Sequence, residues 1–188
     1  MGGSLIYLMG PSGAGKDTLL EIAKVRFAGL WGIKFARRYI TRPANAGGED
    51  FTSISQPAFD YLDAKGYFFF SWRSHGLSYG VDRQTGQFLK SGFMVVVNGS
   101  RAYLPRALEL CPKLKPVLVT AEAGVLAARL KNRGRESFDE LTERLRQPDY
   151  DCHRVKNIHI IDNSEELEIA ADKFCSFLSD EMSGNELT

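Results

Sequence analysis

The 188-residue sequence has few cysteines and no long apolar run, and each shortage excludes a class of protein. Its three cysteines form no CxxC pair, so neither a disulfide framework nor a cysteine-ligated metal site is indicated, and a reducing compartment is expected. The apolar stretch LIYLM at 5–9 is too short for a membrane span or for the core of a signal peptide. A cytoplasmic protein is therefore expected.

The sequence also lacks an excess of charge of one sign. It has 24 Lys and Arg against 23 Asp and Glu, a net charge of +1, and therefore no overall attraction to nucleic acid or to an acidic membrane. We expect neither as a partner, and any recognition of a charged ligand must be local. The sequence leaves the oligomeric state open.

Short apolar runs alternate with amphipathic stretches along a chain whose length suits a single domain, 1–188. This alternation is typical of βαβ units and predicts an α/β fold with a parallel sheet flanked by helices. Helices are expected at 16–28, 101–110, 122–132 and 164–180, the last opened by Asn163 and Glu166 as a capping box. The expected strands are LIYLM (5–9), RYIT (38–41), FMVVV (93–97), PVLVT (116–120) and IHIID (158–162).

Residues 42–83 interrupt this alternation with a segment rich in glycine and aromatic residues. It contains two further strand candidates, YFFFSW and LSYGVD. Because its aromatic side chains need a surface to pack on, the segment is not expected to be a flexible surface loop. We expect a substrate-binding insertion at the rim of the sheet.

The stretch GPSGAGKDT follows the first strand and opens the first helix. The pattern G-x-x-x-x-G-K-[ST] is the signature of the phosphate-binding loop of P-loop NTPases, and this stretch matches it at every fixed position except the last. Its glycines let backbone N–H groups turn toward phosphate oxygens, and the lysine places a charge on the β- and γ-phosphates. The predicted nucleotide-binding residues are Gly10, Pro11, Ser12, Gly13, Ala14, Gly15, Lys16, Asp17 and Thr18.

Asp17 stands where a Ser or Thr hydroxyl ordinarily binds Mg²⁺. The strand 93–97 is followed by the neutral Asn98, where an acidic residue ordinarily supports the metal. The carboxylate has therefore moved from the strand end to the loop, and we hypothesise that Asp17 binds Mg²⁺ directly or through water. Thr18 is an alternative ligand.

Phosphoryl transfer depends on positioning and positive charge rather than on covalent chemistry, and arginines supply that charge. Arg42 lies where the chain enters the insertion. Arg133 and Arg144 lie in ARLKNRGRESFDELTERL, where Gly134 permits a break in the helix and a lid at 133–140. Lys16, Asp17, Arg133 and Arg144 are accordingly the predicted catalytic residues.

The motifs GPSGAGK, ITRP…GGEDF, SYG and RLKNRGRESFDELTERL resemble guanylate kinase, in the same order and over most of the chain. The resemblance implies a five-stranded parallel sheet with a monophosphate-binding insertion and a lid. It implies that Arg42 and Tyr79 bind the acceptor's phosphate and that Arg133 and Arg144 bind the transferring phosphate. Phe51 falls on a phosphate-binding tyrosine and lacks its hydroxyl.

The sequence departs from that family where guanine is recognised. Ser71 and Ser100 stand in place of two acidic residues that read the base, and Asn45 replaces a second acceptor arginine. The guanine N–H donors require carboxylate acceptors, so the loss of both removes specificity for guanine.

GPSGAGKD, RRYITR, VVVNGSRAYLP and KNRGRE closely resemble a narrower family, the ribose 1,5-bisphosphate phosphokinases, in which Asp follows the loop lysine. The resemblance implies ATP-dependent phosphorylation of ribose 1,5-bisphosphate to 5-phosphoribosyl 1-diphosphate in phosphonate catabolism. We expect ATP and Mg²⁺ as cofactors and a sugar bisphosphate as substrate. The expected substrate-binding residues are Arg42, Ser71, Tyr79, Asn98, Ser100 and, on the distal 5-phosphate, Arg101.

Two alternatives stay open on the sequence. One is a guanylate or other nucleoside monophosphate kinase with relaxed base choice. The other is a catalytically inactive guanylate-kinase-like module that binds protein ligands, which the intact phosphate loop disfavours.

Overall fold

The computed structural model describes residues 2–44, 50–133, 155 and 157–186, and the statements below concern those residues. Five strands form one sheet in the order β2-β7-β1-β8-β9, and every neighbouring pair is parallel. The strands are β1 (Leu5–Met9), β2 (Ile33–Phe35), β7 (Met94–Asn98), β8 (Lys115–Thr120) and β9 (His159–Asp162).

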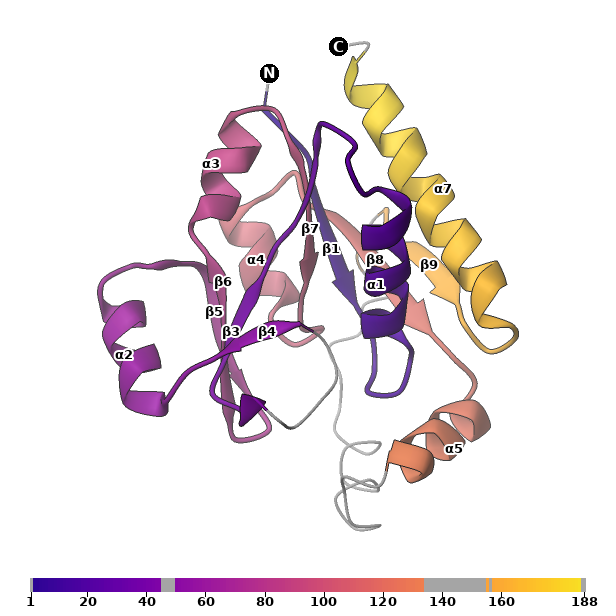
Figure 1. Ribbon diagram of the computed structural model, residues 1–188, viewed down its shortest axis with the longest axis horizontal. Helices are drawn as coiled ribbons and strands as arrows, with labels where there is room; N and C mark the ends of the chain where they lie inside the picture. The colour runs from indigo at the N-terminus through magenta and orange to yellow at the C-terminus, as the bar shows by residue number, and fades with distance from the viewer. Residues whose placement is uncertain (1, 45–49, 134–154, 156, 187–188) are drawn as a thin grey trace.

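Because the strands are parallel, their carboxyl ends lie along one edge of the sheet (Figure 1). The chain leaves β1 for β2 and β7 on one side and continues with β8 and β9 on the other. The carboxyl end of β1 therefore lies at the topological switch point, where open α/β sheets bind their ligands.

Helices cover both faces of this sheet (Figure 1). Along β7, Met94 and Val96 face one hydrophobic cluster with α1 and α7, whereas Val95 and Val97 face a second cluster with α3 and α4. This two-sided burial explains the continuous apolarity of the central strands. The helices are α1 (Lys16–Arg26), α3 (Gln84–Lys90), α4 (Leu104–Leu110), α5 (Ala123–Arg133) and α7 (Leu167–Glu186).

A second, smaller sheet stands beside the first, with strand order β4-β3-β6-β5. Its antiparallel β5–β6 hairpin turns at His75 and Gly76, whose φ values of 50° and 71° match a two-residue type I′ turn. Helix α2 (Gln56–Ala64), capped by Ser55, covers it. The strands are β3 (Arg38–Ile40), β4 (Phe51–Ser53), β5 (Phe68–Ser74) and β6 (Leu77–Asp82).

The structure confirms the predicted α/β class, the five-stranded parallel sheet and the two strand candidates of the insertion, and it corrects two assignments. The segment 38–41, expected as one of the strands of the parallel sheet, contributes β3 to the small sheet instead, and β2 is the fifth strand of the main sheet. Asn163 does not cap the last helix, because α7 begins at Leu167 and the Asn163 amide nitrogen is bound to the phosphate loop. No helix among the described residues is both long and apolar enough to cross a membrane.

Candidate active site

The predicted phosphate loop connects β1 to α1 at the switch point of the main sheet. Gly15 precedes the helix with φ 90° and ψ 12°, a left-handed conformation that glycine adopts without strain. A Cβ on Gly10 would lie 2.2 Å from the Val119 carbonyl oxygen, so the loop packs directly against β8. The predicted loop residues thus form a tight turn at the amino end of a helix, which suits an anion such as phosphate.

Lys16 folds its side chain back over the loop. Its Nζ donates to the carbonyl oxygens of Gly10, at 2.8 Å, and Pro11, at 2.9 Å. The ammonium group is therefore held at the mouth of the turn, where it would meet the phosphates of a bound nucleotide.

Asn163, which directly follows β9, holds the phosphate loop in place through a side-chain hydrogen bond. Its side chain is 1% exposed, and its Nδ2 donates to the carbonyl oxygen of Ala14 at 2.8 Å. A Cβ on Gly15 would lie 2.3 Å from the same nitrogen. Sequence analysis missed this role because the contact spans 149 residues and leaves no local pattern.

Asp17 and Asn98 meet at the carboxyl end of β7. The Asn98 Nδ2 donates to the Asp17 Oδ1 at 2.9 Å, and Asn98 is buried. The neutral strand end and the acidic loop position, paired in the sequence argument, are thus adjacent in space. Asp17 offers a hard oxygen ligand in the first turn of α1, which fits a magnesium ion that takes its other ligands from phosphates and water. Within 2–44, 50–133 and 157–186, no three His, Cys, Asp or Glu side chains gather into a metal site.

The two predicted phosphate-binding residues of the acceptor side belong to neighbouring strands of the small sheet, Tyr79 within β6 and Arg42 shortly after β3. Thr41 and Ser78 are joined by two hydrogen bonds, from Thr41 N to Ser78 O at 3.1 Å and from Ser78 N to Thr41 Oγ1 at 2.9 Å. Tyr79 lies opposite Ile40 in the antiparallel pair of β3 and β6, so it is two positions along the neighbouring strand from Arg42. The guanidinium of Arg42 lies 4.4 Å from the centre of the Phe51 ring. Phe51, which lacks the hydroxyl of the family's tyrosine, thus supports Arg42 by a cation–π contact.

Tyr79 belongs to a stack of side chains that sequence analysis missed. Its ring lies parallel to Trp72 at 5.4 Å, Trp72 stacks on Tyr103 at 5.5 Å, and the Arg38 guanidinium lies 5.5 Å from the Tyr79 ring. Tyr103 immediately precedes α4, so the stack joins the small sheet to the loop after β7.

Ser71 does not share the face of Tyr79. It pairs with Gly80, whereas Trp72 pairs with Tyr79 and stacks on it. Because side chains alternate along a strand, the Ser71 side chain lies on the opposite face of the hairpin. Its backbone is hydrogen-bonded to the Tyr103 hydroxyl. The pKa of that hydroxyl is raised overall, because burial raises it by more than the hydrogen bond from Ser71 lowers it.

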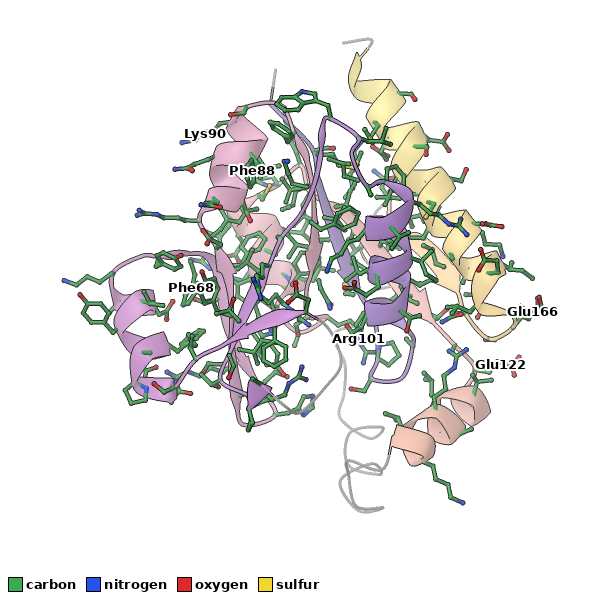
Figure 2. The ribbon with its side chains drawn as sticks, in the orientation of Figure 1. Phe68, Phe88, Lys90, Arg101, Glu122 and Glu166 are labelled. Atoms are coloured by element: carbon green, nitrogen blue, oxygen red, sulfur yellow. The ribbon has the colours of Figure 1, made fainter. Side chains whose placement is uncertain are left out.

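Ser100 and Arg101 follow β7 in a short loop between the two sheets. The Ser100 backbone is bound to the Tyr7 hydroxyl beneath it, and Arg101 is half-buried. In the view of Figure 2, Arg101 projects between the small sheet and the phosphate-loop end of α1. Asn98, Ser100 and Arg101 thus lead from the phosphate loop to the acceptor side.

Arg144 and the predicted lid beyond Arg133 lie outside the described residues, as does Asn45. Arg133 ends α5, and the structure describes its backbone only.

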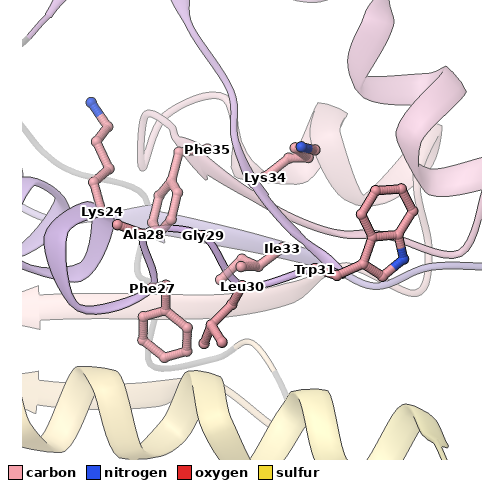
Figure 3. A pocket seen from close by; sticks show the side chains of 9 residues that line it. All are labelled: Lys24, Phe27, Ala28, Gly29, Leu30, Trp31, Ile33, Lys34 and Phe35. Carbon is pink, nitrogen blue, oxygen red and sulfur yellow. The ribbon is translucent and has the colours of Figure 1, made fainter.

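A separate hollow of about 430 Å³ lies at the other end of α1 from the phosphate loop (Figure 3). Its lining includes Lys24, Phe27, Leu30, Trp31 and Phe35. Its position excludes it from the site described above.

Comparison with known proteins finds curated relatives that are named as kinases, although no family model matches the chain. It is 47% identical over 182 residues to ribose 1,5-bisphosphate phosphokinase PhnN of Laribacter hongkongensis, covering 94% of this chain and 43% of that protein. It is 42% identical over 178 residues to the protein of the same name in Thiobacillus denitrificans, covering 95% and 94%. The fold is similar to that of a guanylate kinase from Anaplasma phagocytophilum, with a TM-score of 0.69, 20% identity, and coverage of 96% and 87%.

Proposed function

The chain belongs to the ribose 1,5-bisphosphate phosphokinase family, and from that premise we propose that it phosphorylates ribose 1,5-bisphosphate at the expense of ATP. The products are 5-phosphoribosyl 1-diphosphate and ADP. An oxygen of the sugar's 1-phosphate attacks the γ-phosphorus of ATP. A new O–P bond forms as the bond to the β,γ-bridging oxygen breaks, and the electron pair of that bond leaves with ADP.

The chemistry needs no general base. A phosphate monoester has a second pKa of about 6, so the attacking oxygen is already ionised at neutral pH. The protein's task is to bring two anions together and to stabilise the charge on the transferring group. The described site supplies this with backbone N–H groups and cations.

We assign the donor half of the site to the phosphate loop, residues 10–18. Its glycine backbone and Lys16 hold the phosphates of ATP. Asp17, oriented by Asn98 at 2.9 Å, holds Mg²⁺, which neutralises charge on the β- and γ-oxygens when bound. Arg133 and Arg144 remain the proposed lid residues for the transferring phosphate.

We assign the acceptor half to the small sheet and the loop after β7. Arg42, supported by Phe51, and Tyr79 bind the 1-phosphate. The hydroxyl of Ser100 and the amide of Asn98 suit the ribose, and Arg101 suits the distal 5-phosphate. Ser71 contributes through its backbone contact with Tyr103, because its side chain lies on the other face of the hairpin.

One observation carries the choice of acceptor: an intact phosphate loop stands beside a loop, residues 98–101, that has no carboxylate. A guanine base requires an acidic partner for its N–H donors, whereas a bisphosphate would be repelled by one. The neutral Ser100 beside Arg101 therefore favours the sugar bisphosphate.

The test is to incubate the protein with ATP, Mg²⁺ and ribose 1,5-bisphosphate and to identify the product by ³¹P NMR. The proposal predicts a sugar that carries a diphosphate, formed in equal amount to ADP. Lys16→Ala serves as the control and should lower the rate by at least about 100-fold. ADP formation without a sugar diphosphate would refute the proposal.

A further inference from the structure

A tyrosine lies in the central strand of the main sheet, where an aliphatic residue is expected. Tyr7 is fully buried within β1, at 0% exposure, and its ring packs edge-on against Phe70 of the small sheet. A buried phenol must find hydrogen-bond partners for its hydroxyl. The partners of Tyr7 lie 93 residues away, in the loop after β7.

The Tyr7 hydroxyl binds the backbone of one residue twice. It accepts from Ser100 N at 2.9 Å and donates to Ser100 O at 3.0 Å. The same carbonyl oxygen also accepts from Tyr103 N at 3.2 Å. Since the Ser100 N–H and both lone pairs of its carbonyl are engaged, only its side-chain hydroxyl is left for a ligand.

The ring of Tyr7 also shapes the preceding residue. A Cβ on Gly99 would lie 2.1 Å from the Tyr7 Cζ, closer than any real contact, so glycine is required there. The Gly99 N–H donates to Leu8 O at 2.8 Å, which holds the loop onto the strand that carries Tyr7. The Tyr7 ring therefore packs directly against the loop backbone at Gly99.

This loop connects the two halves of the site. At one end Asn98 contacts Asp17 of the phosphate loop, and at the other Arg101 extends toward the acceptor side. Loops are ordinarily more mobile than the strands and helices that they join, and a transfer reaction loses much of its rate when the acceptor is misplaced by about 1 Å. The hydrogen bonds that fix the Ser100 backbone in the middle of the loop therefore help to keep the acceptor at a constant position.

We propose that Tyr7 is a positioning residue for the acceptor. Its hydroxyl fixes the backbone of Ser100, and with it the start of the Arg101 side chain, so that both meet the sugar bisphosphate at a set distance from the phosphate loop. The inference rests on the proposed function for the identity of that acceptor. Tyr7 itself is enclosed in the core and does not touch substrate.

The test is Tyr7→Phe, which keeps the ring and removes the hydroxyl. We expect the KM for ribose 1,5-bisphosphate to rise about tenfold, because both hydrogen bonds that fix Ser100 are lost and substrate binding must then order the loop. The dissociation constant of a non-hydrolysable ATP analogue should stay within about twofold. The matched control is Tyr39→Phe, which removes a hydroxyl bonded to Tyr67 at 3.0 Å and should leave both constants unchanged. An unchanged KM in a folded Tyr7→Phe protein would overturn the proposal.

A second readout separates this inference from the proposed function. In the wild-type protein the Ser100 amide hydrogen should exchange slowly with solvent, and Tyr7→Phe should accelerate that exchange while β1 and β7 stay protected. Rapid exchange in the wild type refutes the role of Tyr7 even if the sugar is a substrate. Slow exchange without turnover of the sugar refutes the proposed acceptor and leaves the fixed loop standing.

If Tyr7→Phe does not fold, Gly99→Ala tests the same point with the hydroxyl in place. The added Cβ pushes the loop off the Tyr7 ring, so the KM for the sugar bisphosphate should rise while binding of the ATP analogue is retained. Equal KM values for Gly99→Ala and the wild type would contradict the proposal.

Discussion

At the scale of single residues, the site differs from an ordinary phosphate loop at one position, Asp17. Its carboxylate receives a hydrogen bond from Asn98 at 2.9 Å. The acidic group thus stands in the loop, where a hydroxyl is ordinary, and a neutral amide stands at the strand end, where a carboxylate is ordinary. The sequence indicated only that the carboxylate ordinarily found at the strand end stands in the loop instead, and it did not predict the hydrogen bond between the two side chains. Its distance and direction required the structure.

Asp17→Asn should raise the Mg²⁺ concentration needed for half-maximal activity by about tenfold or more, because a neutral amide is a poorer ligand for a hard cation. A magnesium titration of the initial rate measures this. Asp180→Asn, an exposed change on α7, is the matched control and should leave the titration unaltered. The assignment of Asp17 to the metal is abandoned if both variants titrate like the wild type.

A second residue-scale prediction concerns Ser100. Ser100→Asp places a negative charge beside the anionic acceptor and should lower kcat/KM for ribose 1,5-bisphosphate by about tenfold or more. The control variant Ser100→Asn introduces a neutral side chain of the same size and shape as aspartate, so the comparison isolates the effect of charge. Equal losses in the two variants would show that size, and not charge, matters at this position.

At the scale of elements, the end of β9 and the phosphate loop form one unit. Gly15→Ala would force a Cβ to within 2.3 Å of the Asn163 amide nitrogen at a φ of 90°. We expect a loss of about 1–3 kcal/mol in the free energy of unfolding and a loss of ATP binding. Gly124→Ala in α5, where a Cβ meets nothing within 4 Å, should instead be neutral or slightly stabilising. Urea denaturation compares the two, and equal effects would refute the packing argument.

The stability of the protein should also depend on pH through His159 of strand β9. His159 stacks on Phe177 of α7 at 4.3 Å, and burial lowers the pKa of its imidazole. Below the ordinary histidine pKa of about 6.5 the unfolded chain takes up a proton more readily than the folded one, so stability should fall as the pH drops through this range. In His159→Phe, which keeps the stacked ring, that part of the slope should disappear. Parallel curves of unfolding free energy against pH for the two proteins would contradict the assignment.

The elements also show where sequence patterns stop being informative. β1, β7, β8 and β9 were predicted within a residue or two. The first three are buried on both faces and read as continuous apolar runs, whereas β9 lies at the edge of the sheet with Ile160 exposed. β2 was missed: it has three residues, includes Lys34 and lies at the edge of the sheet. β3 was identified as a strand but assigned to the wrong sheet, because alternation within three residues does not specify a partner.

At the scale of the whole molecule, the two halves of the proposed site lie on different sheets. The main sheet carries the phosphate loop at its switch point, and the small sheet carries Arg42 and Tyr79. The stack of Tyr79, Trp72 and Tyr103 and the loop held by Tyr7 join them. The motifs of both halves were legible in the sequence, whereas the contacts that join them were not, since they connect residues far apart in the chain.

The central claim is that a nucleotide-kinase scaffold here accepts a sugar bisphosphate. The most direct measurement is kcat/KM for ribose 1,5-bisphosphate and for GMP, made side by side with ATP and Mg²⁺. Our account predicts a preference for the sugar of about 1,000-fold or more, because a site without the carboxylates leaves the guanine donors unpaired. Comparable or greater turnover of GMP would contradict it and would make the chain a nucleoside monophosphate kinase.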